Sequence, residues 1–543
     1  MKNYILQIFE EASSKLEYLK DINLVFTVPN QKEHGDYSSN AALILAKKLG
    51  RNPRELAAEI ISNLTVDEKV ISKMEIAGPG FINFYFNNSA TTEIINVVLD
   101  QKENFGKSEK YSGKKAMVEF VSANPTGPLT VGHGRNAVIG DTVSNMLEWI
   151  GYKVDKEYYF NNAGRQMRVL GDSLRLRYLQ LIGQNIDFPE DYYQGEYIVD
   201  IAKKIYENDG DKYKDEKAEE FFKEQAEKEI FADIEKTLNN LNIKMDYYFN
   251  EYRLYVDGRV EKLLDLFKQK NLSYEKDGAV WLKLSELGND QDKVIVKSSG
   301  EPTYRLPDIA YHITKFERGY DLMVDLFGSD HNATYPDVLA GLKSLGYDIN
   351  KVKVLIHQFV TIMDKGEVVK MSTRKANFVT LDELMEEVGA DVVRYFFIMR
   401  SISSHLNFDL DIAKKHSDEN PVFYLQYAHA RICSILRMTE EEKLELSVEN
   451  LHLLITEAEQ NILKKIYQFE EEILYSSENF EPHRIANYLE ELAGLFHKFY
   501  NECRIIRAES KELSEARIAL VTAVKQVLKN GLSILGLSAP ERM

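Results

Sequence analysis

A strand, a loop rich in glycine and proline, and a helix follow one another directly near the start of the second hundred residues. Residues 117–121 form a short apolar run typical of a buried strand, and residues 134–150 carry apolar side chains at helical spacing until Gly151. A second strand is predicted over residues 153–160. A strand that returns through a helix pairs in parallel with the strand it leaves. The chain is therefore constrained to an α/β fold built on a parallel sheet.

The remaining strands of this sheet are expected beyond a long insertion. Residues 174–250 are mostly helical and highly charged, and we predict a second insertion at about residues 260–300. Residues 322–327 and 352–360 have the apolar pattern of strands that return to the sheet. The central unit is then a Rossmann-like open sheet with insertions, over residues 111–375.

Two further domains are predicted on either side. Residues 1–110 indicate a small α/β domain, with helices over residues 38–49 and 53–64. Residues 376–410 form a connecting segment, and beyond residue 411 the strand signals end. An all-α bundle is predicted there, with amphipathic helices over residues 422–438, 457–476, 483–507 and 515–537.

Composition indicates the cellular compartment in which the chain is expected to function. With 543 residues the chain is too long for a single core, and no apolar run approaches the roughly 18 residues that a membrane span needs. The N-terminus carries acidic residues where a signal peptide would be basic. Cys433 and Cys503 are the two cysteines, too few for a disulfide framework or a Cys-rich zinc site. We expect a cytoplasmic protein with reduced thiols and no membrane partner.

The net charge and the local charge distribution point in different directions on whether the chain binds nucleic acids. A net charge of −18 argues against general phosphate binding, so no DNA partner is expected. Residues 351–375, however, contain six Lys or Arg against two acids. A local basic track inside an acidic protein is compatible with one specific polyanionic ligand.

The loop at residues 123–133 reads Ala-Asn-Pro-Thr-Gly-Pro-Leu-Thr-Val-Gly-His. Gly132 and Gly134 remove side chains where a ligand could touch the backbone, and His133 stands at the start of the following helix. Free N–H groups and the helix dipole at such a position favour phosphate oxygens. The alternative is an ordinary strand-to-helix connection with His133 as a cap, and this loop alone favours neither interpretation.

A second segment, Lys-Met-Ser-Thr-Arg at residues 370–374, follows a hairpin-like turn at residues 364–367. Nucleotidyl transfer needs cations that position and neutralise phosphates, and Lys370 and Arg374 are of that type. By itself a solvated basic loop is the preferred interpretation. The two segments together favour a shared phosphate site, because both would lie at one edge of the sheet.

The two segments resemble the paired motifs of class I aminoacyl-tRNA synthetases. Residues 130–133 stand where that class has His-Ile-Gly-His, and residues 370–374 stand where it has Lys-Met-Ser-Lys-Ser. Residues 118–128, 308–312 and 420–431 resemble longer strings of the bacterial-type arginyl branch. The resemblance covers essentially the whole chain.

This resemblance implies ATP-dependent activation of L-arginine to arginyl-adenylate, followed by transfer to the 2′-hydroxyl of the terminal adenosine of tRNA(Arg) during translation. It implies ATP and Mg²⁺ as cofactors, no zinc and no protein metal site, a monomer, and activation that itself needs tRNA. The N-terminal domain would contact the tRNA elbow. The C-terminal bundle would bind the anticodon stem and loop.

The resemblance also assigns residues for the nucleotide. It implies that adenosine and ribose contact Gly132, His133, Gly328 and Asp330. It implies that the triphosphate contacts Lys370, Met371, Ser372 and Arg374. The catalytic group would be Thr130, His133, Lys370 and Arg374.

Arginine and tRNA contacts are implied in the same way. The arginine-binding residues would be Glu119, Ser122, Asn124, Glu251, Tyr304 and Asp308. Tyr304 and Asp308 lie four residues apart and share a face if that stretch is helical, with Pro307 tolerated only in a first turn. Without the resemblance Tyr304 and Asp308 would be interpreted as a surface pair and Glu251 as a plain surface acid. Tyr427, His429 and Arg431 would contact tRNA, with helix packing as the alternative.

Two departures from the family pattern leave alternatives open. Thr130 replaces the first histidine of the first motif, and Thr373 replaces the second lysine of the second motif, while Arg374 supplies a cation one position later. A catalytically impaired tRNA-binding paralogue is therefore a second hypothesis. A class I enzyme for cysteine is a third, although that branch selects its substrate with zinc and only two thiols are present.

Overall fold

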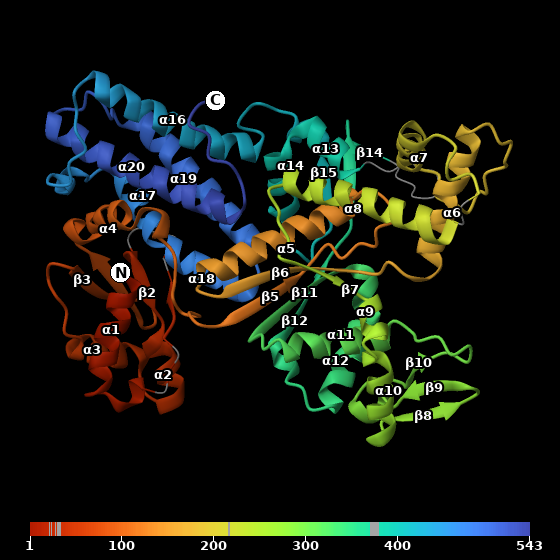
Figure 1. The fold of residues 1–543 in the computed structure, drawn as a ribbon. Helices are drawn as coiled ribbons and strands as arrows, with labels where there is room; N and C mark the ends of the chain where they lie inside the picture. Colours follow the sequence, from red (N-terminus) through yellow and green to blue (C-terminus); the bar gives the residue numbers. More distant parts are fainter. Residues whose placement is uncertain (21, 23, 28, 30–33, 216–217, 370–379) are drawn as a thin grey trace.

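The computed structural model describes residues 1–20, 22, 24–27, 29, 34–215, 218–369 and 380–543. A small N-terminal domain, a central domain around a parallel sheet and a C-terminal bundle of long helices lie next to one another (Figure 1). The predicted combination of α/β catalytic domain, small α/β N-terminal domain and all-α bundle is confirmed.

The N-terminal domain is a four-stranded antiparallel sheet with its own core. The side chain of Asn52 accepts hydrogen bonds from the backbone of Arg54 and Glu55 and so starts α3, as its sequence predicts. The predicted helix over residues 38–49 begins later, because residues 37–39 pair with β4 as a strand. The elements are α1 Lys2–Ser13, β1 Phe26–Thr27, β2 Tyr37–Ser39, α2 Ala41–Leu49, α3 Pro53–Asn63, β3 Ile71–Ala77 and β4 Phe81–Phe86.

Helix α4 (Asn88–Gln101) does not belong to that core. Its buried residues Ile94, Ile95 and Val98 join the main core of the molecule, and α4 contacts α17 and α20 of the C-terminal bundle. The predicted boundary near residue 110 grouped this helix with the N-terminal domain. The separate N-terminal core ends at Phe86.

The central sheet has the strand order β12-β11-β5-β6-β7, and every pair is parallel. After β7 the chain returns to place β11 beside β5, so the order of the strands reverses between β5 and β11. Ligands of open α/β sheets bind at the carboxyl ends of the strands near such a reversal. The strands are β5 Lys115–Glu119, β6 Lys153–Phe160, β7 Tyr247–Asn250, β11 Leu322–Gly328 and β12 Val352–His357.

Both faces of the sheet are covered, as its apolar strands require. Ala116 and Val118 of β5 face the core shared with α5 (Val131–Trp149), whereas Met117 between them packs with Phe316 and Leu339. These two residues belong to α11 (Arg305–Glu317) and α12 (Tyr335–Ser344) on the other face (Figure 1).

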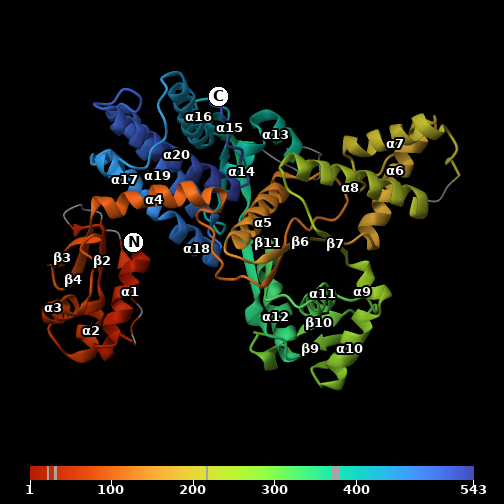
Figure 2. The same ribbon diagram turned by 60° about the vertical axis from the view of Figure 1, so that its left-hand side comes forward.

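Both predicted insertions are present. The first consists of α6 Gly164–Leu181, α7 Glu196–Asp209, η4 Ala218–Phe222 and α8 Lys223–Asn240. It extends away from the sheet on the side opposite the N-terminal domain (Figure 2). The second consists of α9 Tyr252–Val256, α10 Arg259–Gln269 and an antiparallel sheet of β8 Ser273–Lys276, β9 Ala279–Leu282 and β10 Lys293–Val296.

The strand predicted over residues 352–360 is too long. Strand β12 ends at His357, and Val360 begins a new strand that pairs in parallel with β15 in a separate small sheet. The hairpin predicted at residues 364–367 is confirmed, with Lys365 and Gly366 at φ of 50° and 77° in its turn. This part contains β13 Val360–Asp364, β14 Glu367–Val368, α13 Leu381–Val388, α14 Ala390–Ile398, β15 Leu406–Asp409 and α15 Leu410–Ala413.

The C-terminal bundle has one more helix than predicted. The chain bends at Gln468, which divides residues 457–479 into two helices and brings Phe469 against Phe105 with ring centroids 5.8 Å apart. A buried ion pair of 2.7 Å between Arg517 and Glu459 joins α20 to α17. The helices are α16 Pro421–Glu441, α17 Glu457–Tyr467, α18 Phe469–Asn479, α19 Pro482–Glu502 and α20 Lys511–Ile534. Within the described residues, no helix is both long and apolar enough to cross a membrane.

A single buried arginine connects three parts of the molecule. Arg394 of α14 donates to the Asp141 carboxylate of α5 at 2.6 Å, to the Leu241 carbonyl after α8 at 2.7 Å and to the Leu535 carbonyl after α20 at 3.1 Å. Carbonyls at helix ends lack partners within the helix, so the guanidinium caps both α8 and α20. A Cβ on Gly536 would stand 2.0 Å from this guanidinium, which explains a glycine there.

Candidate active site

The candidate site lies at the carboxyl edge of the sheet, where β5 ends. Val121 and Ser122 follow this strand with φ of +64° and +45°, and the chain then crosses the edge to α5. A β-branched residue rarely adopts this left-handed conformation, and such strain concentrates at functional sites. The side chain of Asn136 holds the turn, because it accepts from the Val121 N–H at 2.6 Å and donates to the Leu326 carbonyl of β11 at 3.0 Å.

His133 is fixed in one orientation at the start of α5. The Thr130 N–H donates to Nδ1 of His133 at 3.2 Å, and the Thr130 hydroxyl lies 3.3 Å from the same nitrogen. Since Nδ1 accepts, the proton of the neutral ring is on Nε2. Burial lowers the pKa of His133, which favours this neutral form. His133 therefore offers a neutral Nε2–H donor at a helix N-terminus, and Thr130 positions its ring.

The second motif, Lys370, Met371, Ser372, Thr373 and Arg374, lies outside the described residues. The chain that follows it returns to the first motif. Thr380 forms an antiparallel bridge with Thr130, and the Leu381 N–H donates to the Leu129 carbonyl at 2.9 Å. Gly134 permits this approach, because a Cβ there would lie 2.5 Å from Leu381.

The first acid of the predicted arginine pocket, Glu251, directly follows β7. Its side chain is buried, and its two oxygens accept from the hydroxyls of Tyr159 at 2.8 Å and Tyr255 at 3.4 Å. Burial raises the pKa of Glu251. A desolvated carboxylate between aromatic rings suits a planar guanidinium, whose five donors match carboxylate geometry.

Asp308 lies in the first turn of α11, together with Pro307 as predicted. Burial, reinforced by the nearby carboxylates of Glu251 and Glu119, raises the pKa of Asp308 to about 7. The structure thus brings Asp308 and Glu251 together from distant parts of the chain. Tyr304 precedes α11 and is 84% exposed, so its side chain is not buried with Glu251.

Glu119, Ser122 and Asn124 support the pocket through contacts with the protein. Glu119 accepts from the Ser122 hydroxyl at 3.2 Å and from Lys315 at 2.6 Å, so both of its oxygens are occupied. The Asn124 side chain accepts from the Asn161 N–H at 3.0 Å and donates to Gln166. These contacts connect the ends of β5 and β6.

Sequence reasoning missed a buried charged layer behind this pocket. Lys315 contacts Asp325 as well as Glu119, and His312 contacts Asp325 from the other side. A signal was available, since Asp308, His312 and Lys315 follow one another at four- and three-residue spacing on one helix face.

Of the residues predicted to contact the nucleotide, Gly328 closes β11, and the backbone of Asp330 continues into a short 3₁₀ helix, Ser329–Ala333. Gly132 is exposed in the first turn of α5. Gly328 is therefore at the carboxyl end of β11, and Gly132 is at the start of the helix that follows β5, the strand beside β11 at the reversal of strand order.

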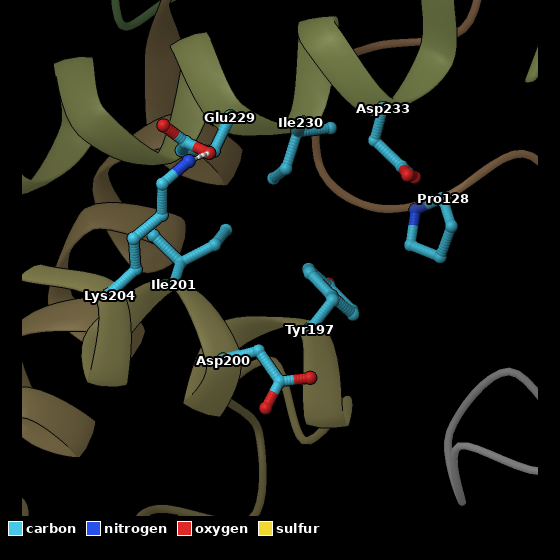
Figure 3. Close-up of a pocket in the computed structure, with 8 residues that line it drawn as sticks. All are labelled: Pro128, Tyr197, Asp200, Ile201, Lys204, Glu229, Ile230 and Asp233. Atoms are coloured by element: carbon cyan, nitrogen blue, oxygen red, sulfur yellow. Dashed lines mark hydrogen bonds and ion pairs between the residues drawn. The ribbon is translucent and has the colours of Figure 1, made fainter. Parts of the chain in front are cut away.

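The helical insertion forms a wall of the site. A hollow of about 710 Å³ lies between the first-motif loop and the loop before α7, and the Tyr197 hydroxyl joins the two by donating to the Thr126 carbonyl at 2.6 Å. Its lining includes Asn124, Thr130, His133, Tyr192, Tyr193 and Gln194. Figure 3 shows a smaller hollow beside Pro128, between α7 and α8, with apolar walls from Ile201 and Ile230.

Two of the three predicted tRNA-binding residues share a surface. The guanidinium of Arg431 lies 5.3 Å from the ring of Tyr427 and 4.0 Å from the ring of Tyr500, beside a hollow of about 430 Å³. His429 does not belong to this surface. It is 2% exposed and binds the Pro540 carbonyl at 2.8 Å, because two residues along a helix turn the side chain to the opposite face.

Comparison with known proteins agrees with this architecture. Residues 3–86 match the family profile "Arginyl tRNA synthetase N terminal domain", residues 94–395 match "tRNA synthetases class I (R), catalytic domain", and residues 425–543 match "DALR anticodon binding domain".

Curated relatives named "Arginine--tRNA ligase" are similar over nearly their full length. The protein of Desulfotalea psychrophila is 50% identical, with 95% of this chain and 94% of the relative covered, and that of Salinibacter ruber is 49% identical over 100% of both. The structure of Thermus thermophilus arginyl-tRNA synthetase has a TM-score of 0.78 at 22% identity and shares the fold over 100% of both chains. The chain belongs to the arginyl-tRNA synthetase family of class I.

Proposed function

We propose that this protein is an arginine–tRNA ligase, which activates L-arginine with ATP and transfers it to the 2′-hydroxyl of the terminal adenosine of tRNA(Arg) for translation. One observation carries the proposal: a neutral donor at a helix N-terminus and the two neighbouring carboxylates of Glu251 and Asp308 lie at the same edge of the sheet. The relatives near 50% identity bear the name of this activity.

Arginine binds with its guanidinium between Glu251 and Asp308. The phenols of Tyr159 and Tyr255 already hold the Glu251 carboxylate in place, so little ordering is needed when the substrate enters. A lysine ammonium cannot make two parallel hydrogen bonds to each of two carboxylates, which gives selectivity for arginine. Asn124, Ser122, Glu119 and Tyr304 complete the proposed arginine site.

The reaction is an in-line attack of the arginine carboxylate on the α-phosphate of ATP. The bond from α-phosphorus to the bridging oxygen breaks and pyrophosphate leaves, so no side chain acts as a nucleophile. His133 donates from Nε2 to phosphate oxygens as their charge grows, and Thr130 keeps the ring aligned. Gly132, Gly328 and Asp330 are proposed to contact adenosine and ribose, and Lys370, Met371, Ser372 and Arg374 the triphosphate.

Mg²⁺ has no protein cage in the part of the chain that the structure describes, because no group of three or more His, Cys, Asp and Glu side chains there could hold a metal ion. Mg²⁺ commonly binds through substrate phosphates and water. The ion would therefore arrive with the triphosphate, and no step above is assigned to it.

The protein is proposed to act as a monomer. Its tRNA is proposed to extend from the N-terminal domain to the C-terminal bundle. Tyr427 and Arg431 offer a stacking ring and a guanidinium for unpaired anticodon bases. The N-terminal domain is proposed to contact the tRNA elbow, and the C-terminal bundle is proposed to bind the anticodon stem and loop. The cytoplasm is the proposed location.

Exchange of pyrophosphate into ATP, measured with each amino acid in the presence of total tRNA, tests the proposal. Arginine alone should support exchange. The impaired-paralogue hypothesis predicts weak exchange that Thr130→His restores. The contact of Thr130 with His133 argues against it, since threonine already orients the ring. Exchange with cysteine would favour the third hypothesis.

A further inference from the structure

Lys315 is completely buried behind the proposed arginine pocket. Its ammonium lies 2.6 Å from a carboxylate oxygen of Glu119, 2.6 Å from one of Asp325 and 4.3 Å from the ring centre of Tyr311. Two carboxylates and a ring face thus replace the water that an ammonium normally needs. A buried cation is costly unless paired in this way.

His312 extends the layer on the opposite side of Asp325. Its Nδ1 lies 2.8 Å from the Asp308 carbonyl oxygen, and its Nε2 lies 2.9 Å from the second oxygen of Asp325. A carbonyl and a carboxylate only accept, so the ring donates from both nitrogens and carries a positive charge. The layer therefore contains two cations, Lys315 and His312, and two carboxylates, Glu119 and Asp325.

The carboxylates of Glu251 and Asp308, in front of this layer, are not paired with cations of the protein in the same way. Within the described residues, neither Glu251 nor Asp308 forms an ion pair, and the partners of the Glu251 carboxylate are the neutral side chains of Tyr159, Asn161 and Tyr255. The cation that would pair with them is the guanidinium of the substrate. The ionisable groups that face Asp308 from the surrounding elements are Glu119, Tyr159, Glu251, Tyr255, His312 and Lys315.

We propose that Lys315 is a positioning residue whose buried charge determines how strongly the pocket attracts the guanidinium of arginine and how this attraction varies with pH. This inference rests on the proposed function, since it takes arginine as the ligand. Lys315 acts through Glu119, Asp325 and Asp308 and does not touch the substrate.

Loss of the buried charge should shift arginine binding in a definite direction. Without Lys315, Glu119 and Asp325 lose their shared cation, and their negative field favours the protonated form of Asp308. Lys315 and His312 both oppose the rise in the pKa of Asp308 that burial causes. A protonated Asp308 cannot pair with guanidinium, so arginine binding moves to higher pH when either cation is removed.

Equilibrium dialysis of radiolabelled arginine against the full-length protein from pH 6 to pH 9 tests this. For the natural protein, affinity should fall about tenfold per pH unit below the midpoint. Lys315→Met should move the midpoint upward by about one pH unit, and His312→Gln should move it in the same direction. Lys315→Arg should keep the midpoint, because the charge remains.

The double variant Asp325→Asn with Lys315→Met removes one charge of each sign and should return the midpoint toward that of the natural protein. If Lys315→Met alone does not fold, the double variant provides a folded protein in which the loss of the Lys315 charge can be measured. A Lys315→Met or His312→Gln protein that binds arginine more weakly by one factor at every pH, with the midpoint unchanged, would show a merely structural role and overturn the inference.

The Asp308→Asn variant distinguishes a failure of the proposed arginine site from a failure of the proposed role of Lys315. If this variant binds arginine as well as the natural protein does, the pocket is not the arginine site and the proposed assignment fails. If binding is lost in Asp308→Asn while Lys315→Met leaves the midpoint unchanged, the site stands and only the positioning role of Lys315 is wrong.

Discussion

Asp308→Asn should stabilise the free protein while it destroys arginine binding. The carboxyl is held in the fold beside Glu251 and Glu119, and its pKa is raised from 3.8 to about 7. A raised carboxyl pKa means that the folded state holds the proton more tightly than the unfolded chain. Stability is therefore lost progressively as pH rises from about 4 to about 7, and above that range the cost is constant.

The size of the effect follows from the shift. About three pKa units correspond to about 4 kcal/mol when the carboxylate is fully ionised. Asp308 retains some contact with solvent, which screens part of this cost, so we expect a gain of about 2 kcal/mol for asparagine at pH 8. In a domain of this size that is a rise in melting temperature of about 4 °C.

Differential scanning calorimetry of both proteins at pH 5 and pH 8 measures this gain. The difference in melting temperature should be smaller at pH 5, where the natural Asp308 is still protonated. Saturating arginine should raise the melting temperature of the natural protein only, because binding to the folded state stabilises it. A variant that melts below the natural protein at pH 8, or a difference that does not grow with pH, would refute the reasoning.

Three other variants follow from the contacts. Arg394→Met should lower the free energy of unfolding by about 3–5 kcal/mol, because it leaves two helix ends without their partner and Asp141 with Lys156 alone, and a melting temperature equal to that of the natural protein would exclude this role. His133→Ala should slow pyrophosphate exchange by about 10²-fold, whereas Thr130→Val, which keeps the backbone contact, should slow it by less than about tenfold. Arg431→Ala should raise KM for tRNA about tenfold and leave KM for arginine unchanged in charging assays, and equal changes in both constants would contradict its placement.

The elements that govern the site could be predicted because local sequence specifies them. Val131–Trp149 and Lys153–Phe160 follow directly from their apolar periodicity and from the glycine between them. Pro307 could be placed in a first turn from backbone sterics alone.

Features that depend on distant contacts could not be predicted in this way. The end of the strand at His357 depends on pairing between β13 and β15, which residues 352–360 do not encode. The orientation of His429 depends on the Pro540 carbonyl at the far end of the chain. Likewise the spacing of Asp308, His312 and Lys315 indicates only a shared helix face, because Glu119 and Asp325 are brought to Lys315 by separate strands.

Charging of total tRNA with radiolabelled amino acids tests the central claim most directly. The natural protein should attach arginine and no other amino acid in an ATP-dependent reaction, and Glu251→Gln, which keeps the size of the side chain but removes its charge, should lose charging at physiological arginine concentrations. Attachment of a different amino acid, or undiminished arginine charging by Glu251→Gln, would contradict the assignment of function and of the pocket.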